Sequence, residues 1–186
     1  MKKLILLFAA LAAASLSLNA QTPDEIVAKI EKANHPDIES RFEEKRSFKS
    51  APGQNYAGKL TFRNPDALTL KYDDASEGFQ IDASKVSITH QGKTAVFDAT
   101  KNLMMKSLSH ALIYAFQGRI TELVAEQDTS LEVAREGNMC CVTLNALKKS
   151  ARGYKSMVIN YSAKDCGIRS MRLDEFTGVS TFYELK

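Results

Sequence analysis

The sequence contains no tryptophan, only 9 glycines and 4 prolines, and no low-complexity run. Chains that stay unfolded are usually poor in apolar residues and carry a large charge of one sign. Here 44% of the residues are hydrophobic, and 25 basic residues face 22 acidic ones. These numbers exclude a flexible linker protein, predict an ordered globular chain, and give no reason to expect nucleic acid as a partner.

Motifs that carry catalysis are also missing. There is no Gly-x-Ser-x-Gly elbow, phosphate-binding loop or His-Glu-x-x-His pair. The three histidines, His35, His90 and His110, are far apart and follow no ligand spacing. The acids Glu43 and Glu44 are neighbours on a predicted strand, so they point to opposite faces and are interpreted as solvated charges. We therefore expect no enzyme, no cofactor and no metal site.

The first twenty residues have the pattern of an export signal. Met1-Lys2-Lys3 is basic, "LILLFAALAAASLSL" is apolar but short for a membrane span, and Ala20 is a small residue suited to cleavage. An uncleaved N-terminal anchor is the alternative. We expect a cleaved signal peptide over 1–20, a periplasmic location, and one domain over 21–186. That domain has 186 − 20 = 166 residues and a net charge of 23 − 22 = +1.

Most of the remaining sequence alternates between apolar and polar residues. In "GKLTFRNPDALTLKYDD", residues 58–74, two alternating runs flank Asn64-Pro65-Asp66 and predict a β-hairpin with one apolar face. Further alternating runs predict strands in "IESRFEEKRSFK", "GFQIDAS", "KVSITHQ", "TAVFDA", "SLEVARE", "MCCVTLNAL", "YKSMVINYS", "GIRSMRLDEF" and "VSTFYEL". Short turns such as Gly137-Asn138, Arg152-Gly153 and Thr177-Gly178 indicate antiparallel neighbours.

Two segments have helical spacing instead. Thr22-Pro23-Asp24-Glu25 is a capping box with proline at the first helical position, and Asn34-His35-Pro36 ends that helix. Apolar residues recur every three or four positions over 101–117, and Gly118 is the predicted C-cap. Residues 120–126 either extend this helix or form a short one of their own.

Strands that are apolar on one face only, with few helices, are typical of a curved sheet around a hollow. We predict a mainly β (α+β) fold: an incomplete, strongly curved antiparallel β-barrel of about ten or eleven strands with two or three helices over its concave face. Arg46 interrupts the apolar face and is expected near its rim. The side chains expected to line the hydrophobic cavity are Phe42, Phe48, Leu60, Phe62, Leu70, Tyr72, Phe79 and Ile81.

The sequence resembles the periplasmic lipoprotein carrier family LolA. The resemblance lies in "FEEK" at 42–45, "GKLTFRNPDALTLKY" at 58–72, "GFQIDASKVSI" at 78–88 and "KTAVFDATKN" at 93–102, together with an export signal and a mid-chain amphipathic helix. It implies a LolA-like half-barrel and a monomer that takes acylated lipoproteins from an inner-membrane lipoprotein-releasing transporter to an outer-membrane acceptor that is not identified. The family holds its lid with an arginine directly before the hairpin proline. This chain has Asn64 there and Arg63 one position earlier, which turns the side chain to the other face.

The helix at 101–117 has two interpretations. Its methionine, leucine and phenylalanine side chains are either ordinary core or a movable lid whose flexible thioethers adapt to acyl chains. The proposed lid residues are Met104, Leu108, Leu112 and Phe116.

The three cysteines allow at most one internal bridge. If "MCCVTLNAL" and "YKSMVINYS" form a hairpin, residue 140 lies near residue 161, and the following turn carries Cys166 to the same end. A disulfide from Cys166 to Cys140 or Cys141 is therefore possible, subject to strict geometry.

The leading functional hypothesis is a periplasmic carrier that shields the acyl chains of lipoproteins in a hydrophobic cavity. The alternative is a lipid- or lipoprotein-sensing module on the same fold that transports nothing.

Overall fold

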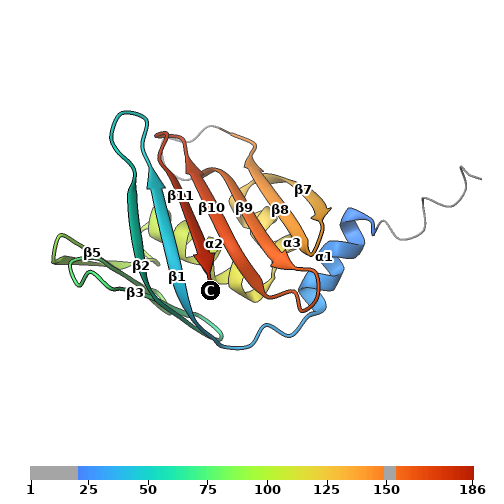
Figure 1. Cartoon of the computed structure of the whole chain (residues 1–186), viewed down its shortest axis with the longest axis horizontal. Coiled ribbons are helices and arrows are strands. Elements are labelled where there is room, and N and C mark those ends of the chain that lie inside the picture. The colour runs from blue at the N-terminus through green and yellow to red at the C-terminus, as the bar shows by residue number, and fades with distance from the viewer. Residues whose placement is uncertain (1–20, 149–153) are drawn as a thin grey trace, which may run out of the picture.

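A computed structural model describes residues 21–148 and 154–186 (Figure 1). The predicted signal peptide, residues 1–20, and the predicted turn at Arg152-Gly153 lie outside the described residues. The elements in chain order are α1 (Pro23–Lys32), β1 (Ile38–Ser47), β2 (Gln54–Arg63), β3 (Ala67–Tyr72), β4 (Gly78–Asp82), β5 (Lys85–His90), β6 (Lys93–Asp98), α2 (Leu103–Gln117), α3 (Ile120–Gln127), β7 (Thr129–Glu136), β8 (Met139–Ala146), β9 (Tyr154–Ser162), β10 (Ile168–Glu175) and β11 (Ser180–Leu185).

All eleven strands form one antiparallel sheet in the order β6-β5-β4-β3-β2-β1-β11-β10-β9-β8-β7. Strands β1 to β6 form one meander and β7 to β11 a second, and the two are joined where β1 pairs with β11. The edge strands β6 and β7 are not paired with each other, so the curved sheet is not closed into a barrel. The predicted fold class is confirmed.

The helices lie on one side of this sheet (Figure 1). The chain between edge strands β6 and β7 has to pass from one edge of the sheet to the other, and α2 and α3 make that passage across the concave face. No helix in the described part of the chain is both long and apolar enough to cross a membrane.

The local signals at the helix ends act as the sequence predicts. The Thr22 hydroxyl accepts a hydrogen bond from the backbone N–H of Glu25, and the Glu25 carboxylate accepts one from the backbone N–H of Thr22 at 2.8 Å. Gly118 ends α2 in the left-handed conformation with φ 65°. Because Gly118 breaks the helix, residues from Ile120 onward form the separate helix α3.

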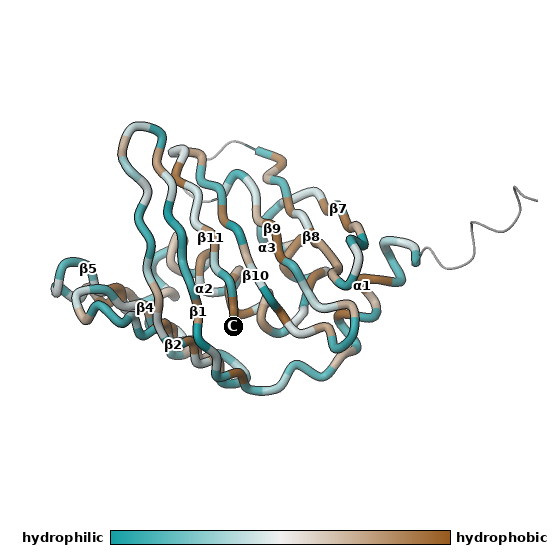
Figure 2. The backbone as a smooth tube through the Cα atoms, in the orientation of Figure 1, coloured by the Kyte–Doolittle hydropathy of each residue, from teal (hydrophilic) through white to brown (hydrophobic). Residues whose placement is uncertain are grey.

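The residues of the hairpin alternate between buried and exposed, as the sequence predicts. Leu60 and Phe62 in β2 lie opposite Leu70 and Leu68 in β3, and all four are buried, while Lys59 is exposed. Figure 2 shows the same alternation of hydrophobic and hydrophilic residues along the strands. The apolar face of the hairpin therefore belongs to the concave side of the sheet.

Close packing over Gly58 shapes the middle of the sheet. Gly58 lies between Phe42 of β1 and Tyr72 of β3, whose rings meet edge to face with centroids 5.1 Å apart. A Cβ atom on Gly58 would stand 2.3 Å from the Lys71 carbonyl oxygen and 2.7 Å from the Phe42 ring. The two aromatic rings thus occupy the space that a side chain would need.

We expect Gly58→Ala to lower the free energy of unfolding by about 1–3 kcal/mol or more, because backbone atoms and a buried ring must move. Urea denaturation of the mature chain measures this. The matched control is Gly78→Ala, whose Cβ would meet only the Thr89 side chain at 3.3 Å. That control should change stability by less than about 1 kcal/mol. Equal losses in both variants would show that Gly58 is not packed as described.

Candidate hydrophobic ligand cavity

A cavity of about 270 Å³ lies between the sheet and α2. Most of its wall is aliphatic or aromatic and comes from β2 to β5, from α2, and from β9 to β11. The lining residues are Arg46, Leu60, Leu68, Leu70, Phe79, Ile88, Leu108, Leu112, Phe116, Tyr154, Ile168, Met171, Leu173, Glu175, Thr181, Tyr183 and Leu185. This chemistry suits an alkyl chain, because apolar surface gains by leaving water and needs no specific polar partner.

Three of the residues predicted for the cavity line it, namely Leu60, Leu70 and Phe79. Four others, Phe42, Phe62, Tyr72 and Ile81, are buried in the core and are not part of the cavity wall. Alternation correctly places all seven on the apolar face, but it does not show which of them pack against neighbours.

Phe48 differs from its predicted position. It lies beyond the last residue of β1, Ser47, is half-buried, and does not line the cavity. The strand ends before Phe48, so the alternation that would have placed it on the concave face no longer applies.

Half of the wall comes from strands that the sequence analysis did not assign to the site. Thr181, Tyr183 and Leu185 alternate along β11, and Ile168 and Leu173 come from β10. The same alternation was present in these strands. What the sequence does not show is that β11 pairs with β1 and so stands next to the predicted half of the cavity.

Helix α2 covers the cavity with one face. Leu108, Leu112 and Phe116 line the cavity, as the lid interpretation requires. Met104 does not: its side chain is 44% exposed, and Met105 takes the inward position with 4% exposure. The prediction for Met104 is wrong because the helix begins at Leu103, and its first turn, with Leu103 83% exposed, extends beyond the core.

The C-terminal end of α2 is held by three specific contacts. The Phe116 ring stacks on Phe62 with centroids 5.3 Å apart. The Tyr161 hydroxyl donates a hydrogen bond to the Ala115 carbonyl at 2.6 Å, and the Gln117 side-chain amide donates one to the Pro65 carbonyl at 2.6 Å. Near the N-terminal end Leu103 and Met104 are exposed, and Ser107 exchanges hydrogen bonds with Gln127 of α3 at 2.8 and 3.1 Å. The C-terminal end is therefore tied to the sheet and its hairpin, whereas the N-terminal half is tied to α3.

Among the polar contacts of the described residues, none joins Arg63 or Asn64 to α2. Arg63 forms an ion pair with Glu39 on the outer face of the sheet. Asn64 donates from its side chain to the His35 carbonyl at 2.8 Å and from its backbone to Asp37 Oδ1 at 2.9 Å, so it holds the segment between α1 and β1. The hydrogen bond between the hairpin and the helix is donated from the helix side, by Gln117 to Pro65.

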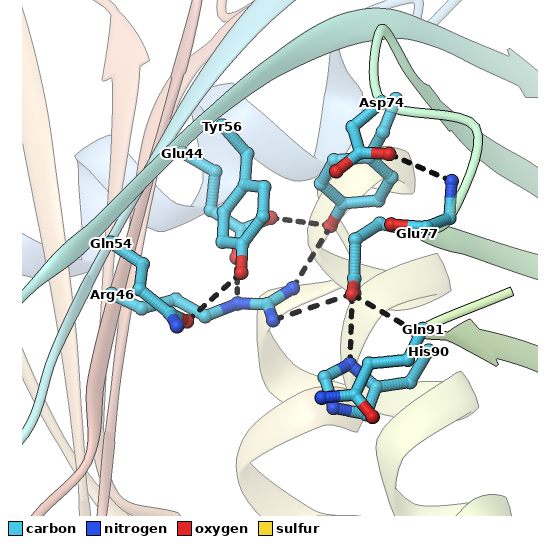
Figure 3. A network of polar contacts seen from close by, with 10 residues as sticks. Glu44, Arg46, Gln54, Tyr56, Asp74, Glu77, His90 and Gln91 are labelled. Atoms are coloured by element: carbon cyan, nitrogen blue, oxygen red, sulfur yellow. Dashed lines mark hydrogen bonds and ion pairs between the residues drawn. The ribbon is translucent and has the colours of Figure 1, made fainter.

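One end of the cavity is polar (Figure 3). Glu44 is fully buried, pairs with Arg46, and accepts a hydrogen bond from the Tyr72 hydroxyl. Arg46 Nη1 also lies 3.8 Å from Glu77 Oε2, and Glu77 Oε1 lies 2.8 Å from His90 Nδ1. The interpretation of Glu44 as a solvated charge is wrong, because Glu44 shares the inward face of β1 with Phe42.

The guanidinium of Arg46 is enclosed by this network. It lies 4.6 Å from the centre of the Tyr56 ring, a cation–π arrangement, and Nη2 is 3.5 Å from the Tyr72 hydroxyl. Burial disfavours the charge, but the charge and hydrogen bond of Glu44 outweigh it and raise the pKa of Arg46. Burial, and next the charge of Glu44, raise the pKa of Tyr72 as well. Arg46 therefore stays charged at any physiological pH, and Tyr72 stays a hydrogen-bond donor.

All three cysteines are free thiols in the structure. Cys140 lies opposite Tyr161 in the β8–β9 pairing, as the predicted hairpin requires, and both Cys140 and Cys166 are buried. The disulfide from Cys166 to Cys140 or Cys141 is not formed. Burial raises the pKa of the Cys166 thiol, whose Sγ lies 3.9 Å from the Lys29 carbonyl. Among residues 21–148 and 154–186, no group of three or more histidine, cysteine or acidic side chains is placed to hold a metal ion.

No protein-family model matches the sequence, and no curated protein sequence matches it. Several solved structures do match the chain. A LolA superfamily protein from Nitrosomonas europaea matches at 6% identity and a TM-score of 0.40, over 90% of this chain and 92% of that one. A putative outer membrane lipoprotein-sorting protein domain from Vibrio parahaemolyticus matches at 11% identity and a TM-score of 0.42, over 87% and 89%. A chain in the structure of the CwlD amidase from Clostridioides difficile in complex with the GerS lipoprotein matches at 11% identity and a TM-score of 0.38, over 86% of this chain and 90% of that one.

The family that the sequence motifs resemble is thus the family named by the first of these structural neighbours. At such identities and TM-scores the neighbours contribute nothing to an argument on function, which has to come from the cavity itself.

Proposed function

We propose that the chain is a periplasmic carrier that shields the acyl chain of a lipoprotein or another acylated ligand. The single observation that carries the proposal is the apolar cavity under α2, a helix whose hydrogen bonds to the sheet and its hairpin lie at its C-terminal end. Burial of an alkyl chain in such a wall is favourable by about 0.8 kcal/mol per methylene. A chain of ordinary length can therefore be held without a charged anchor or a chemical bond.

The cavity measures about 270 Å³. Ligand pockets in proteins usually measure about 300–1,000 Å³. Loading a whole chain, or several chains, requires α2 to move away from the sheet.

The contacts of α2 indicate how that movement would occur. Its C-terminal end is tied to Pro65, Phe62 and Tyr161, while Leu103 and Met104 at its start are exposed and Ser107 is bonded to α3 rather than to the sheet. Tilting about the C-terminal end would enlarge the cavity and lose fewer contacts than lifting the whole helix. A carrier needs such an element, because it has to release what it holds.

We propose that the chain binds its ligand and catalyses no reaction on it. The charged groups at the polar end, Glu44, Arg46 and Glu77, are engaged with one another and with Tyr72 and His90. Charged groups that are paired with one another stabilise the structure of this end of the cavity. Nucleophilic catalysis needs a different arrangement, in which a base is hydrogen-bonded to the nucleophile.

Leu60→Gln should weaken binding of an uncharged fluorescent naphthylamine dye at least about tenfold, and destabilise the fold by about 1–3 kcal/mol, because it buries an unpaired amide. The measurements are dye titration and urea unfolding. Lys59→Gln, next to it on the outer face, should leave both nearly unchanged. Equal sensitivity at the two positions would show that the ligand does not bind on the concave face.

Leu108→Ala should reduce unfolding free energy by less than about 2 kcal/mol, because Leu108 is only half-buried and lies toward the N-terminal end of α2. It should nevertheless speed the release of a bound acyl ligand several-fold. Phe116→Ala, at the anchored end, should cost about 3–5 kcal/mol. Thermal melting of the empty protein and stopped-flow release of the dye give the two readouts. A Leu108 variant that melts like the Phe116 variant, with unchanged release, would make α2 fixed core.

Native mass spectrometry of the protein extracted gently from its own periplasm tests the carrier role directly. A carrier should be recovered partly as a complex with acylated protein, because the acyl chain cannot remain in water unshielded. Recovery with free lipid alone would favour the lipid-sensing module. Recovery from a cytoplasmic fraction would contradict the proposed location.

A further inference from the structure

The polar end of the cavity carries more negative than positive charge. Arg46 lies opposite Thr181 in the β1–β11 pairing, and Glu175 lies opposite Tyr154 in the β9–β10 pairing. All four of these residues line the cavity. Since Arg46 and Glu175 are at strand ends, they form one rim of the half-barrel rather than its floor.

In the part of the chain that the structure describes, Arg46 is the only cation in the cavity wall, and its charge is already paired. Arg46 Nε is bonded to Glu44, Nη2 lies 3.5 Å from the Tyr72 hydroxyl, and Nη1 lies 3.8 Å from Glu77. The Tyr56 ring lies 4.6 Å from the guanidinium. A carboxylate or phosphate entering the cavity would have to compete with Glu44 and Glu77 for Arg46.

The charges do not cancel. Glu44 and Glu77 do not line the cavity themselves but adjoin its wall through Arg46. By formal charge Glu44, Arg46 and Glu77 sum to −1, and Glu175, whose carboxylate accepts a hydrogen bond from Thr177 at 2.8 Å, brings the total to −2. A protonated His90 beside Glu77 would reduce this only to −1. Lys49, which packs against Gly178 on the neighbouring turn, is exposed and is not part of the cavity wall.

Two tyrosines in the cavity wall respond to this negative charge. The pKa of Tyr154 is raised by burial and next by the charge of Glu175. The pKa of Tyr183 is raised well above its ordinary value by burial, and then by Tyr72 and Glu44. A second anion at this end would meet the same burial cost and the same repulsion.

We propose that this carboxylate-rich rim, Glu44, Arg46, Glu77 and Glu175, makes the cavity select against acyl chains that carry an anionic head group. The ligand class that it accepts is an acyl chain joined through a neutral ester or amide, or one with a cationic head. Ionised fatty acids and lipids with a phosphate next to the chain are disfavoured. The inference rests on the proposed function and specifies its ligand.

The head group is the feature by which such a cavity could distinguish its ligands. An apolar wall binds every alkyl chain of the same length about equally, because the hydrophobic effect is not directional. A carrier working beside a membrane meets anionic lipids in excess, so specificity has to include a repulsive element against them. A net negative charge at the rim provides that element without weakening the hold on a neutral anchor.

Tridecanoate and dodecylammonium test the inference, because both carry a dodecyl chain and they have opposite charges at about pH 8. Each is titrated, below its micelle concentration, against the naphthylamine dye bound to residues 21–186. Dodecylammonium should displace the dye at a concentration at least about tenfold lower, which corresponds to about 1.4 kcal/mol. Dodecanol, which is uncharged, is the reference for chain binding alone.

Glu175→Gln and Glu77→Gln should each reduce the ratio between the two amphiphiles several-fold, since each removes one negative charge and leaves the Glu44–Arg46 pair intact. Glu43→Gln is the matched control, because Glu43 is exposed on the outer face of β1 and should leave the ratio unchanged. If tridecanoate binds as well as dodecylammonium, or if neither inward variant alters the ratio, the inference alone is overturned. Failure of all three amphiphiles, including dodecanol, to displace the dye would overturn the proposed function and this inference with it.

Discussion

Strands β1 and β11 come from opposite ends of the described chain and pair from Phe42–Leu185 to Ser47–Ser180. This pairing joins a six-stranded and a five-stranded meander into one sheet, and it places β6 and β7 at the two outer edges. The connection between those edges has to cross the concave face, where α2 and α3 then cover the apolar residues. Without the β1–β11 pairing, each meander would expose its inner face and the cavity would lose one of its walls.

The curvature of the sheet depends on close packing of aromatic side chains in its middle. Phe42 and Tyr72 close over Gly58, and Phe62 stacks on Phe116 of α2. These aromatic contacts fill the space beside the cavity and stop it from extending through the whole half-barrel. The remaining volume is therefore small and lies beneath the face of α2 that carries Leu108 and Leu112.

The buried charges at the rim are costly in isolation. A carboxylate with the burial of Glu44 is tolerated because Arg46 and Tyr72 are bonded to it, and removing either partner would leave an uncompensated charge. In many proteins, replacing a buried ion pair by apolar residues of similar size leaves the stability unchanged. Two carboxylates, Glu44 and Glu77, flank the guanidinium of Arg46, and this arrangement fits a role in choosing the ligand rather than in stability.

The sequence by itself determines the features that depend on near neighbours along the chain. Alternation in 58–74 predicts the hairpin and its buried face, Thr22 and Glu25 predict the start of α1, and Gly118 predicts the end of α2. These succeed because strand alternation, caps and left-handed glycines act within a few residues. The resemblance to LolA rests on the same local patterns.

Only the tertiary structure decides which buried residues enclose empty space. Phe42 and Leu60 have the same alternation, yet one is packed against Tyr72 and the other lines the cavity. Met104 and Met105 differ by one position, and the packing of the helix selects Met105 for the interior. Glu44 and Arg46 become a buried pair because Tyr72 and Glu77 arrive from β3 and its following loop. Cavity walls and buried ion pairs are made by residues far apart in the chain, and a local pattern carries no information on which of them will meet.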